Sequence, residues 1–382
     1  MSYKTNGKLT WTILSISLLT VMAGAAIAPA LGIIREHFSE ASDLALQLVI
    51  SLPALFIILA NLFFSKLCSL TDSRTLALAG LALYCVSGAG CFFADNIVIL
   101  LILRAVLGLS VGIVMPLSTG LLAYYYPPEE QAGLMGLSAA MNQMGGVVAT
   151  FLAGILAQTG WNWSFLVYLL GLIAMVLVAL YLPAEHLKGG EMPSLRLLRR
   201  YHPSVTGMFL VMVLFFIYPT RFAICARSAS QLSDSATTLI MVGLDLVAFL
   251  AGLVFGKLMH GYGRGLRFLS PACFIAGYLC LSSGTALQFL LFGSAFIGIA
   301  VGIGVPYMNT VASMQAGKNA ASTVMPLLSS ALYLGQFLSP LIVTPLSTLI
   351  FDQNCVTAPY RIGVIIGLVY LLQAAICGRE KQ

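Results

Sequence analysis

The feature that most constrains this chain is a series of apolar runs, each long enough to cross a lipid bilayer. A membrane-spanning helix needs about 20 mainly apolar residues. Such runs cover residues 12–34, 44–66, 75–94, 97–125, 132–158, 163–182, 205–227, 236–258, 268–286, 288–313, 320–347 and 361–377. Most connections between them are short, so consecutive helices are expected to run antiparallel. The sequence therefore predicts an all-α integral membrane protein with about twelve transmembrane helices.

The composition agrees with a lipid solvent. The chain is 59% hydrophobic and only 8% charged, whereas a soluble domain carries about 25% charged residues. A water-soluble surface this apolar would aggregate. The first run contains Ala28-Pro29-Ala30, which resembles a signal-peptidase site. Because this run is long and many similar runs follow it, we expect it to be a retained first span.

No pattern in the sequence predicts a metal site, a cofactor or an enzyme active site. The eight cysteines lie mostly in apolar runs and never at C-x-x-C spacing, so we interpret them as buried small hydrophobes. The nucleotide loop Gly-x-x-x-x-Gly-Lys-[Ser/Thr] is absent, which argues against ATP as the direct energy source. No His-x-x-x-His motif or Ser/His/Asp set suggests catalysis.

Basic residues gather on alternate connections. With the N-terminus inside, the outer loops hold only Arg35, Arg227 and Arg361. The cytoplasmic segments hold Lys4, Lys8, Lys66, Arg74, Lys188, Arg196, Arg199, Arg200, Lys257, Arg264, Arg267, Lys318, Arg379 and Lys381. The positive-inside rule then predicts a multi-pass protein of the inner (cytoplasmic) membrane with both termini in the cytoplasm. The same placement accounts for the formal charge of +6 without a nucleic-acid partner.

The chain divides into two related halves. The longest polar connector predicts a cytoplasmic linker at 183–204, between an N-terminal six-helix bundle at 1–182 and a C-terminal bundle at 205–382. Two segments recur 190 or 191 positions apart: Gly108 to Pro116 matches Gly298 to Pro306, and Phe64-Ser65-Lys66-Leu67 matches Phe255-Gly256-Lys257-Leu258. Duplicated bundles that meet at a midplane site are a common transporter architecture.

These features resemble the major facilitator superfamily over nearly the whole chain. The family's loop after helix 2 corresponds to Ser65–Arg74 and, in the second half, to Gly256–Arg264, each without its usual acid. Arg104-Ala105-Val106-Leu107-Gly108 fits the R-x-x-x-G pattern of drug exporters. The chain is most similar to bacterial multidrug exporters of the drug–proton antiporter type, although Ala149-Thr150 replaces the Gly-Pro pair of their helix 5 signature.

Three ionisable residues lie within the predicted spans: Arg104, Arg221 and Asp245. An ionisable group in a span is costly and is therefore a functional candidate. Asp245 is the only carboxylate placed deep in the membrane. Desolvation favours its neutral form, so it can take up a proton from one side and release it to the other. The alternative is that Asp245 is a structural partner for an arginine.

Each arginine has two interpretations. Arg221 follows Pro219, which can kink the helix. We hypothesise that Arg221 pairs with Asp245 in one transport state and separates from it in another; alternatively, Arg221 snorkels to the outer headgroups. The family resemblance links Arg104 either to proton transfer or to holding the interface of helices 1 and 4.

Uncharged polar residues are the remaining candidates. Asn142 and Gln143 lie in the middle of helix 5, and Gln336 lies in its repeat partner, helix 11. They either line a substrate cavity or form interhelical hydrogen bonds. Tyr218 is a further candidate for substrate binding, because an aromatic ring with a polar tip suits an amphipathic ligand.

The resulting functional prediction is a secondary active transporter that works by alternating access. The expected partners are a small, amphipathic or drug-like solute, protons and the lipid bilayer, and the chain is expected to act as a monomer that exports its cargo. The scarcity of charged residues in the spans disfavours highly charged cargo. The alternative is uptake or facilitated diffusion of a metabolite or lipid-like solute by the same fold.

Overall fold

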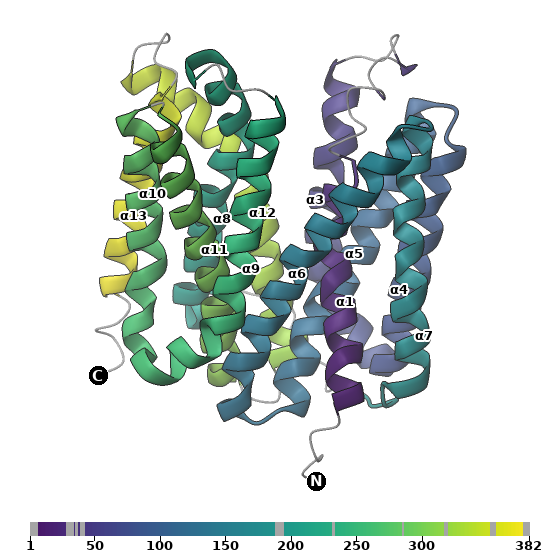
Figure 1. The fold of residues 1–382 in the computed structure, drawn as a ribbon. Helices are drawn as coiled ribbons and strands as arrows, with labels where there is room; N and C mark the ends of the chain where they lie inside the picture. Colours follow the sequence, from purple (N-terminus) through teal and green to yellow (C-terminus); the bar gives the residue numbers. More distant parts are fainter. Residues whose placement is uncertain are drawn as a thin grey trace. The chain divides into compact units, whose positions relative to one another are not determined.

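A computed structural model describes residues 7–27, 34, 37–38, 43–187, 195–230, 234–284, 286–316, 320–351 and 357–376. In chain order the helices are α1 (Gly7–Ala25), α3 (Asp43–Leu70), α4 (Ser73–Gly90), η2 (Cys91–Phe93), α5 (Ile97–Tyr125), α6 (Pro128–Ala157), η3 (Trp161–Leu170), α7 (Gly171–Tyr181), α8 (Leu195–Ser230), α9 (Asp234–Tyr262), η4 (Gly263–Phe268), α10 (Leu269–Ser283), α11 (Leu287–Ala316), α12 (Ala320–Ile350) and α13 (Ala358–Ile376) (Figure 1). The Ala28-Pro29-Ala30 segment and residues 188–194 of the predicted linker lie outside the described residues.

The all-α prediction is confirmed. Within the described ranges, 11 helical stretches are long and apolar enough to cross a membrane. One of them, Leu239–Ser283, is 45 residues long and contains most of α9 and all of η4 and α10, so the twelve expected spans are accounted for. The helix expected over 163–182 differs in kind, because its first part is the 3₁₀ helix η3 and the α-helix begins only at Gly171.

Local chemistry sets several helix ends. The Asp72 side chain accepts a hydrogen bond from the Thr75 backbone N–H at 2.8 Å and caps α4. Asn96 caps α5 in the same way through the N–H of Val98, also at 2.8 Å. These side chains satisfy N–H groups that have no partner inside the helix. Between α5 and α6, Pro127 is extended and Pro128 occupies the first helical position, where its missing N–H costs nothing.

The chain forms two compact units, and each is described by itself. The first unit comprises Met1–Gln131, Met141–Arg200 and Ala312–Ser330, and the second comprises Ala132–Ala140, Tyr201–Val311 and Ala331–Gln382. In the first unit α5 packs against α1, α3 and α4; in the second, α10 packs against α13. Helix α8 begins at Leu195, inside the segment expected to be a linker. The domain boundaries at 182 and 204 stay a prediction.

Glycines bring one helix pair into close contact in each unit. A Cβ atom added to Gly108 of α5 would lie 2.5 Å from the carbonyl oxygen of Pro53 in α3. A Cβ atom added to Gly298 of α11 would lie 2.6 Å from the carbonyl oxygen of Leu244 in α9. Because both members of the pair are displaced by 190 or 191 positions, the packing repeats the duplication seen in the sequence. Only glycine permits this separation of the two backbones.

A second repeated contact has exchanged its donor and acceptor. In the first unit the Ser110 hydroxyl of α5 donates to the Gly80 carbonyl of α4 at 2.9 Å. In the second unit the Ser270 hydroxyl of α10 donates to the Ala300 carbonyl of α11 at 2.8 Å. The two contacts occupy equivalent places, 190 positions apart, but the serine lies on the opposite helix of the pair.

Candidate transport site

Arg104 lies at the centre of the first unit, where its side chain is fully buried. Its Nε donates to the Val49 carbonyl of α3 at 2.9 Å, and its Nη2 donates to the Ala23 carbonyl of α1 at 3.0 Å. Its Nη1 donates to the Tyr168 hydroxyl of η3 at 2.9 Å, and that hydroxyl donates to Ala23. Arg104 thus ties α5 to three other helices. This geometry favours the interface role over the proton-transfer role.

The backbone explains why these two carbonyls are available. Val49 precedes Pro53 by four residues, so the N–H that would bond its carbonyl within α3 is missing. At the end of α1, the N–H of Ile27 bonds the carbonyl of Gly24 instead of that of Ala23. A carbonyl left without a donor in a membrane interior costs free energy. The guanidinium of Arg104 supplies both missing donors.

Asp245 lies half-buried on α9 of the second unit. Within the described part of the chain its carboxylate has no hydrogen bond and no oppositely charged partner. It interacts electrostatically with Tyr218 of α8. The Tyr218 hydroxyl lies 2.7 Å from the Ser294 hydroxyl, which itself donates to the Leu290 carbonyl at 2.7 Å. Tyr218 therefore donates to Ser294, and its own oxygen can only accept from a further partner.

Arg221 has a different partner from the one that we expected. Its Nη2 donates to the Thr344 hydroxyl of α12, within the second unit. The described contacts include no ion pair between Arg221 and Asp245. Pro219 lies inside α8, where it removes the helical donor for the carbonyl of Phe215. Pairing of Arg221 with Asp245 in another transport state stays a hypothesis.

The uncharged polar candidates for substrate binding differ in whether their side chains form hydrogen bonds. Asn142 of α6 accepts a hydrogen bond from the Thr20 hydroxyl of α1 at 2.6 Å. That contact favours the interpretation of Asn142 as a residue that bonds neighbouring helices together. Gln143 and Gln336 are half-buried, and the described residues provide no hydrogen bond to either side chain. Gln143 belongs to the first unit and Gln336 to the second.

Sequence reasoning missed two buried polar residues of the first unit. Asn61 of α3 is 1% exposed. Its Nδ2 donates to the Ser329 hydroxyl at 3.0 Å, and its Oδ1 has no hydrogen-bond partner among the described residues. Gln131 of α6 is 3% exposed and donates to the Ala123 and Tyr126 carbonyls, while accepting from the Ser313 hydroxyl at 2.8 Å. An amide inside an apolar run, as at Asn61, is the signal that could have identified the first of these.

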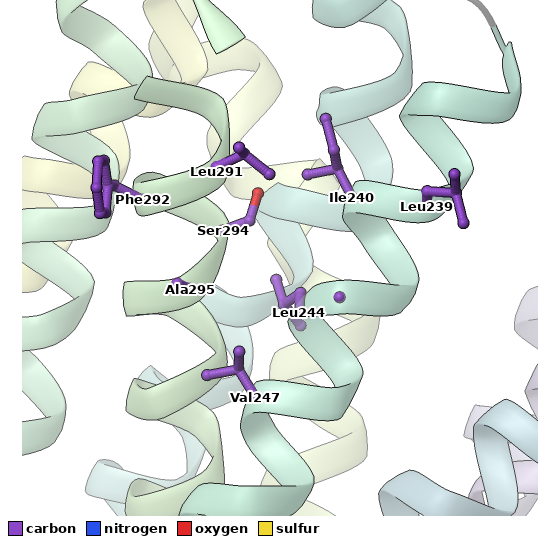
Figure 2. Close-up of a pocket in the computed structure, with 9 residues that line it drawn as sticks. Leu239, Ile240, Leu244, Val247, Leu291, Phe292, Ser294 and Ala295 are labelled. Carbon is purple, nitrogen blue, oxygen red and sulfur yellow. The ribbon is translucent and has the colours of Figure 1, made fainter. Parts of the chain in front are cut away.

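A cavity of about 400 Å³ lies between α9 and α11 in the second unit (Figure 2). The described residues of its walls are apolar except for Ser294, whose hydroxyl points into the space between the two helices (Figure 2). Asp245 is not among the residues that line it. The cavity is therefore separate from the carboxylate. Ser294 lines the cavity and is hydrogen-bonded to Tyr218, the residue with which Asp245 interacts electrostatically.

Comparison with known proteins gives several matches. The quinolone resistance protein NorA of Staphylococcus aureus (strain Mu50) is 25% identical over 357 residues, 88% of this chain and 87% of NorA. The multidrug transporter protein MdtP of Bacillus subtilis is 28% identical over 116 residues, and the thioclapurine efflux transporter tcpA of Claviceps purpurea is 26% identical over 187 residues. The matches to MdtP and tcpA involve 30% and 47% of this chain, and the chain covers only 21% and 34% of their lengths.

Solved structures show the same fold. The human organic anion transporter MFSD10 superposes with a TM-score of 0.82 and 16% identity, over 97% of this chain and 100% of that one. The proton:xylose symporter XylE superposes with a TM-score of 0.78 and 14% identity, over 96% and 94%. The sequence model of the Major Facilitator Superfamily matches residues 13–340. This match spans most of the chain, and the chain therefore belongs to the Major Facilitator Superfamily.

Proposed function

We propose that this protein is a proton-coupled exporter of a small, amphipathic or drug-like solute, working by alternating access. The likeness to a quinolone resistance protein over 88% of the chain supports the cargo class. The likeness to a thioclapurine efflux transporter over 47% of the chain supports the direction. The apolar spans, with few charged side chains, suit a cargo that is largely apolar. The single observation that carries the coupling is the environment of Asp245.

Asp245 is suited to proton exchange because nothing in its described surroundings holds it in one protonation state. A buried carboxylate with a purely structural role is expected to have an arginine, a lysine or several hydrogen-bond donors around it. Asp245 has none among the described residues. Its neutral form can donate to the Tyr218 oxygen, whereas its ionised form cannot donate. Proton loss at Asp245 would therefore prevent a hydrogen bond between α9 and α8 that only the neutral form can donate.

The test is transport by the purified protein in proteoliposomes. Fluorescent amphipathic dyes and a quinolone would be offered with and without a pH gradient. We expect solute uptake by proteoliposomes in which the cytoplasmic side of the protein faces outward to require the pH gradient. We expect Asp245→Asn to abolish the dependence of this uptake on the pH gradient. Asp72→Asn is the matched control, because an asparagine at that position would retain the helix cap and lie outside the spans.

Three results separate the alternatives. Undiminished gradient-driven transport by Asp245→Asn would remove this carboxylate from the coupling step. Equilibration of solute without any proton movement would instead favour facilitated diffusion. Accumulation in the opposite direction would favour uptake, so the assay distinguishes export from both competing functions of this fold.

The proposal includes the setting of the protein in the membrane. We place it in the inner membrane with both termini in the cytoplasm, acting as a single chain. The support is the distribution of basic residues and the 11 candidate spans among the described residues. Under this orientation α9 and α11 both begin at the outer surface.

A further inference from the structure

The cavity between α9 and α11 lies where the two halves of the chain differ in side-chain size. Ser294, on its wall, corresponds to Arg104 at an offset of 190. In the first unit the long side chain of Arg104 crosses from α5 to the backbone of α3. In the second unit the short side chain of Ser294 does not fill the equivalent space between α11 and α9.

Two further exchanges enlarge the same space. Gly243 and Val247 of α9 line the cavity, and the corresponding residues of α3, at an offset of 191, are Leu52 and Phe56. A Cβ atom added to Gly243 would meet nothing within 4 Å. Three large-to-small differences at equivalent positions therefore add space to the cavity.

The cavity is a groove that opens on the exposed apolar surface of α9 and α11. Its rim residues Leu239 and Phe292 are 71% and 64% exposed, whereas Leu244 on its floor is 2% exposed. Val242 and Leu246, on the adjoining surface of α9, are also exposed. Because these helices are membrane spans, an apolar surface of this kind faces hydrocarbon. The groove is continuous with that surface.

The chemistry of the groove selects an apolar occupant. Among the described residues no charged side chain lines it, and the one polar side chain there, Ser294, already donates to Leu290 and accepts from Tyr218. Water would find few hydrogen-bond partners there. We propose that the groove binds one acyl chain of a membrane lipid, from the leaflet in which α9 and α11 begin. The chain would occupy the volume that Arg104 and its larger neighbours fill in the first half.

Photo-crosslinking tests this proposal directly. The protein would be reconstituted in phosphatidylethanolamine and phosphatidylglycerol vesicles containing a phosphatidylethanolamine with a diazirine on one acyl chain. Peptide mass spectrometry would then map the adducts. We expect them to concentrate on 239–247 and 291–295, above the level on the exposed face of α4 around Val86.

A variant with a filled groove serves as the control for the photo-crosslinking experiment. Gly243→Leu restores the residue of the first half, and the open space around Gly243 indicates that the helix will tolerate it. We expect severalfold loss of adducts in the groove and an unchanged yield at Val86. Uniform labelling of all exposed apolar surface, or a groove yield unaffected by Gly243→Leu, would overturn the proposal. Displacement of the adducts by a transported dye would also overturn it, because the occupant would then be cargo.

Discussion

At the scale of single residues, Arg104 acts as a replacement for missing backbone donors. Its guanidinium bonds the carbonyls of Val49 and Ala23, and Pro53 is the reason that the first of these has no helical partner. A charged group buried in this way is stabilised by hydrogen bonds and not by a counter-ion among the described residues. The role depends on the forked geometry of arginine, which lysine does not have.

This role predicts a thermodynamic coupling between Arg104 and Pro53. Arg104→Met should lower the free energy of unfolding by about 2–4 kcal/mol, because two carbonyls lose charge-assisted hydrogen bonds. Pro53→Ala restores an N–H four residues after Val49, so the same change should cost about 1 kcal/mol less in that background. Unfolding of the four variants in detergent micelles measures the cycle. An equal cost of Arg104→Met in both backgrounds would show that Pro53 is irrelevant to the contact.

At the scale of elements, the start of α4 depends on the ionised form of Asp72. Its carboxylate accepts from the backbone N–H and the hydroxyl of Thr75, at 2.8 and 2.7 Å. These hydrogen bonds hold the pKa of Asp72 below its ordinary value of 3.8. The carboxylate lies in a solvent-accessible loop, so the effect concerns the first turn of the helix and not the whole bundle.

The predicted pH dependence follows from the direction of this shift. The unfolded turn binds the proton more readily than the folded turn, so the cap contributes fully above the ordinary value of 3.8 and is lost as the pH falls through the lowered pKa. Hydrogen exchange at Thr75 and Leu76, corrected for intrinsic rates, should show less protection in that acidic range, by up to about 1 kcal/mol. Asp72→Asn caps without titrating, so its corrected protection should stay flat.

At the scale of the whole molecule, the alternation of basic residues predicts which loops meet the cytoplasm. Ser69 before α4 and Asp95 after it are both exposed, so they report on opposite sides of the membrane. We expect an impermeant thiol reagent to label Asp95→Cys in intact cells, and Ser69→Cys only after permeabilisation. The parent chain, with its native cysteines, gives the background. The reverse labelling pattern would invert the proposed orientation.

The fold could be predicted from the sequence because every span must supply its own run of about 20 apolar residues. The partners of Arg104 could not, because two of them are backbone carbonyls whose availability depends on how α1 ends and on where α3 meets α5. Pro53, four residues after Val49, was the one local signal. The hydrogen bond between Tyr218 and Ser294 had no local sequence signal, because the two residues are 76 positions apart.

The exchanged serines have a consequence for how such a duplicated chain can change over time. Ser110 bonds Gly80 in one half, and Ser270 bonds Ala300 at the equivalent crossing in the other. An ancestral half with serine on both helices would have two hydrogen bonds at this crossing. Either serine could then be lost while the other kept the two helices bonded. Each descendant half then retains a different one. Redundancy at a single helix crossing thus gives two copies a route to diverge in sequence while each retains the contact.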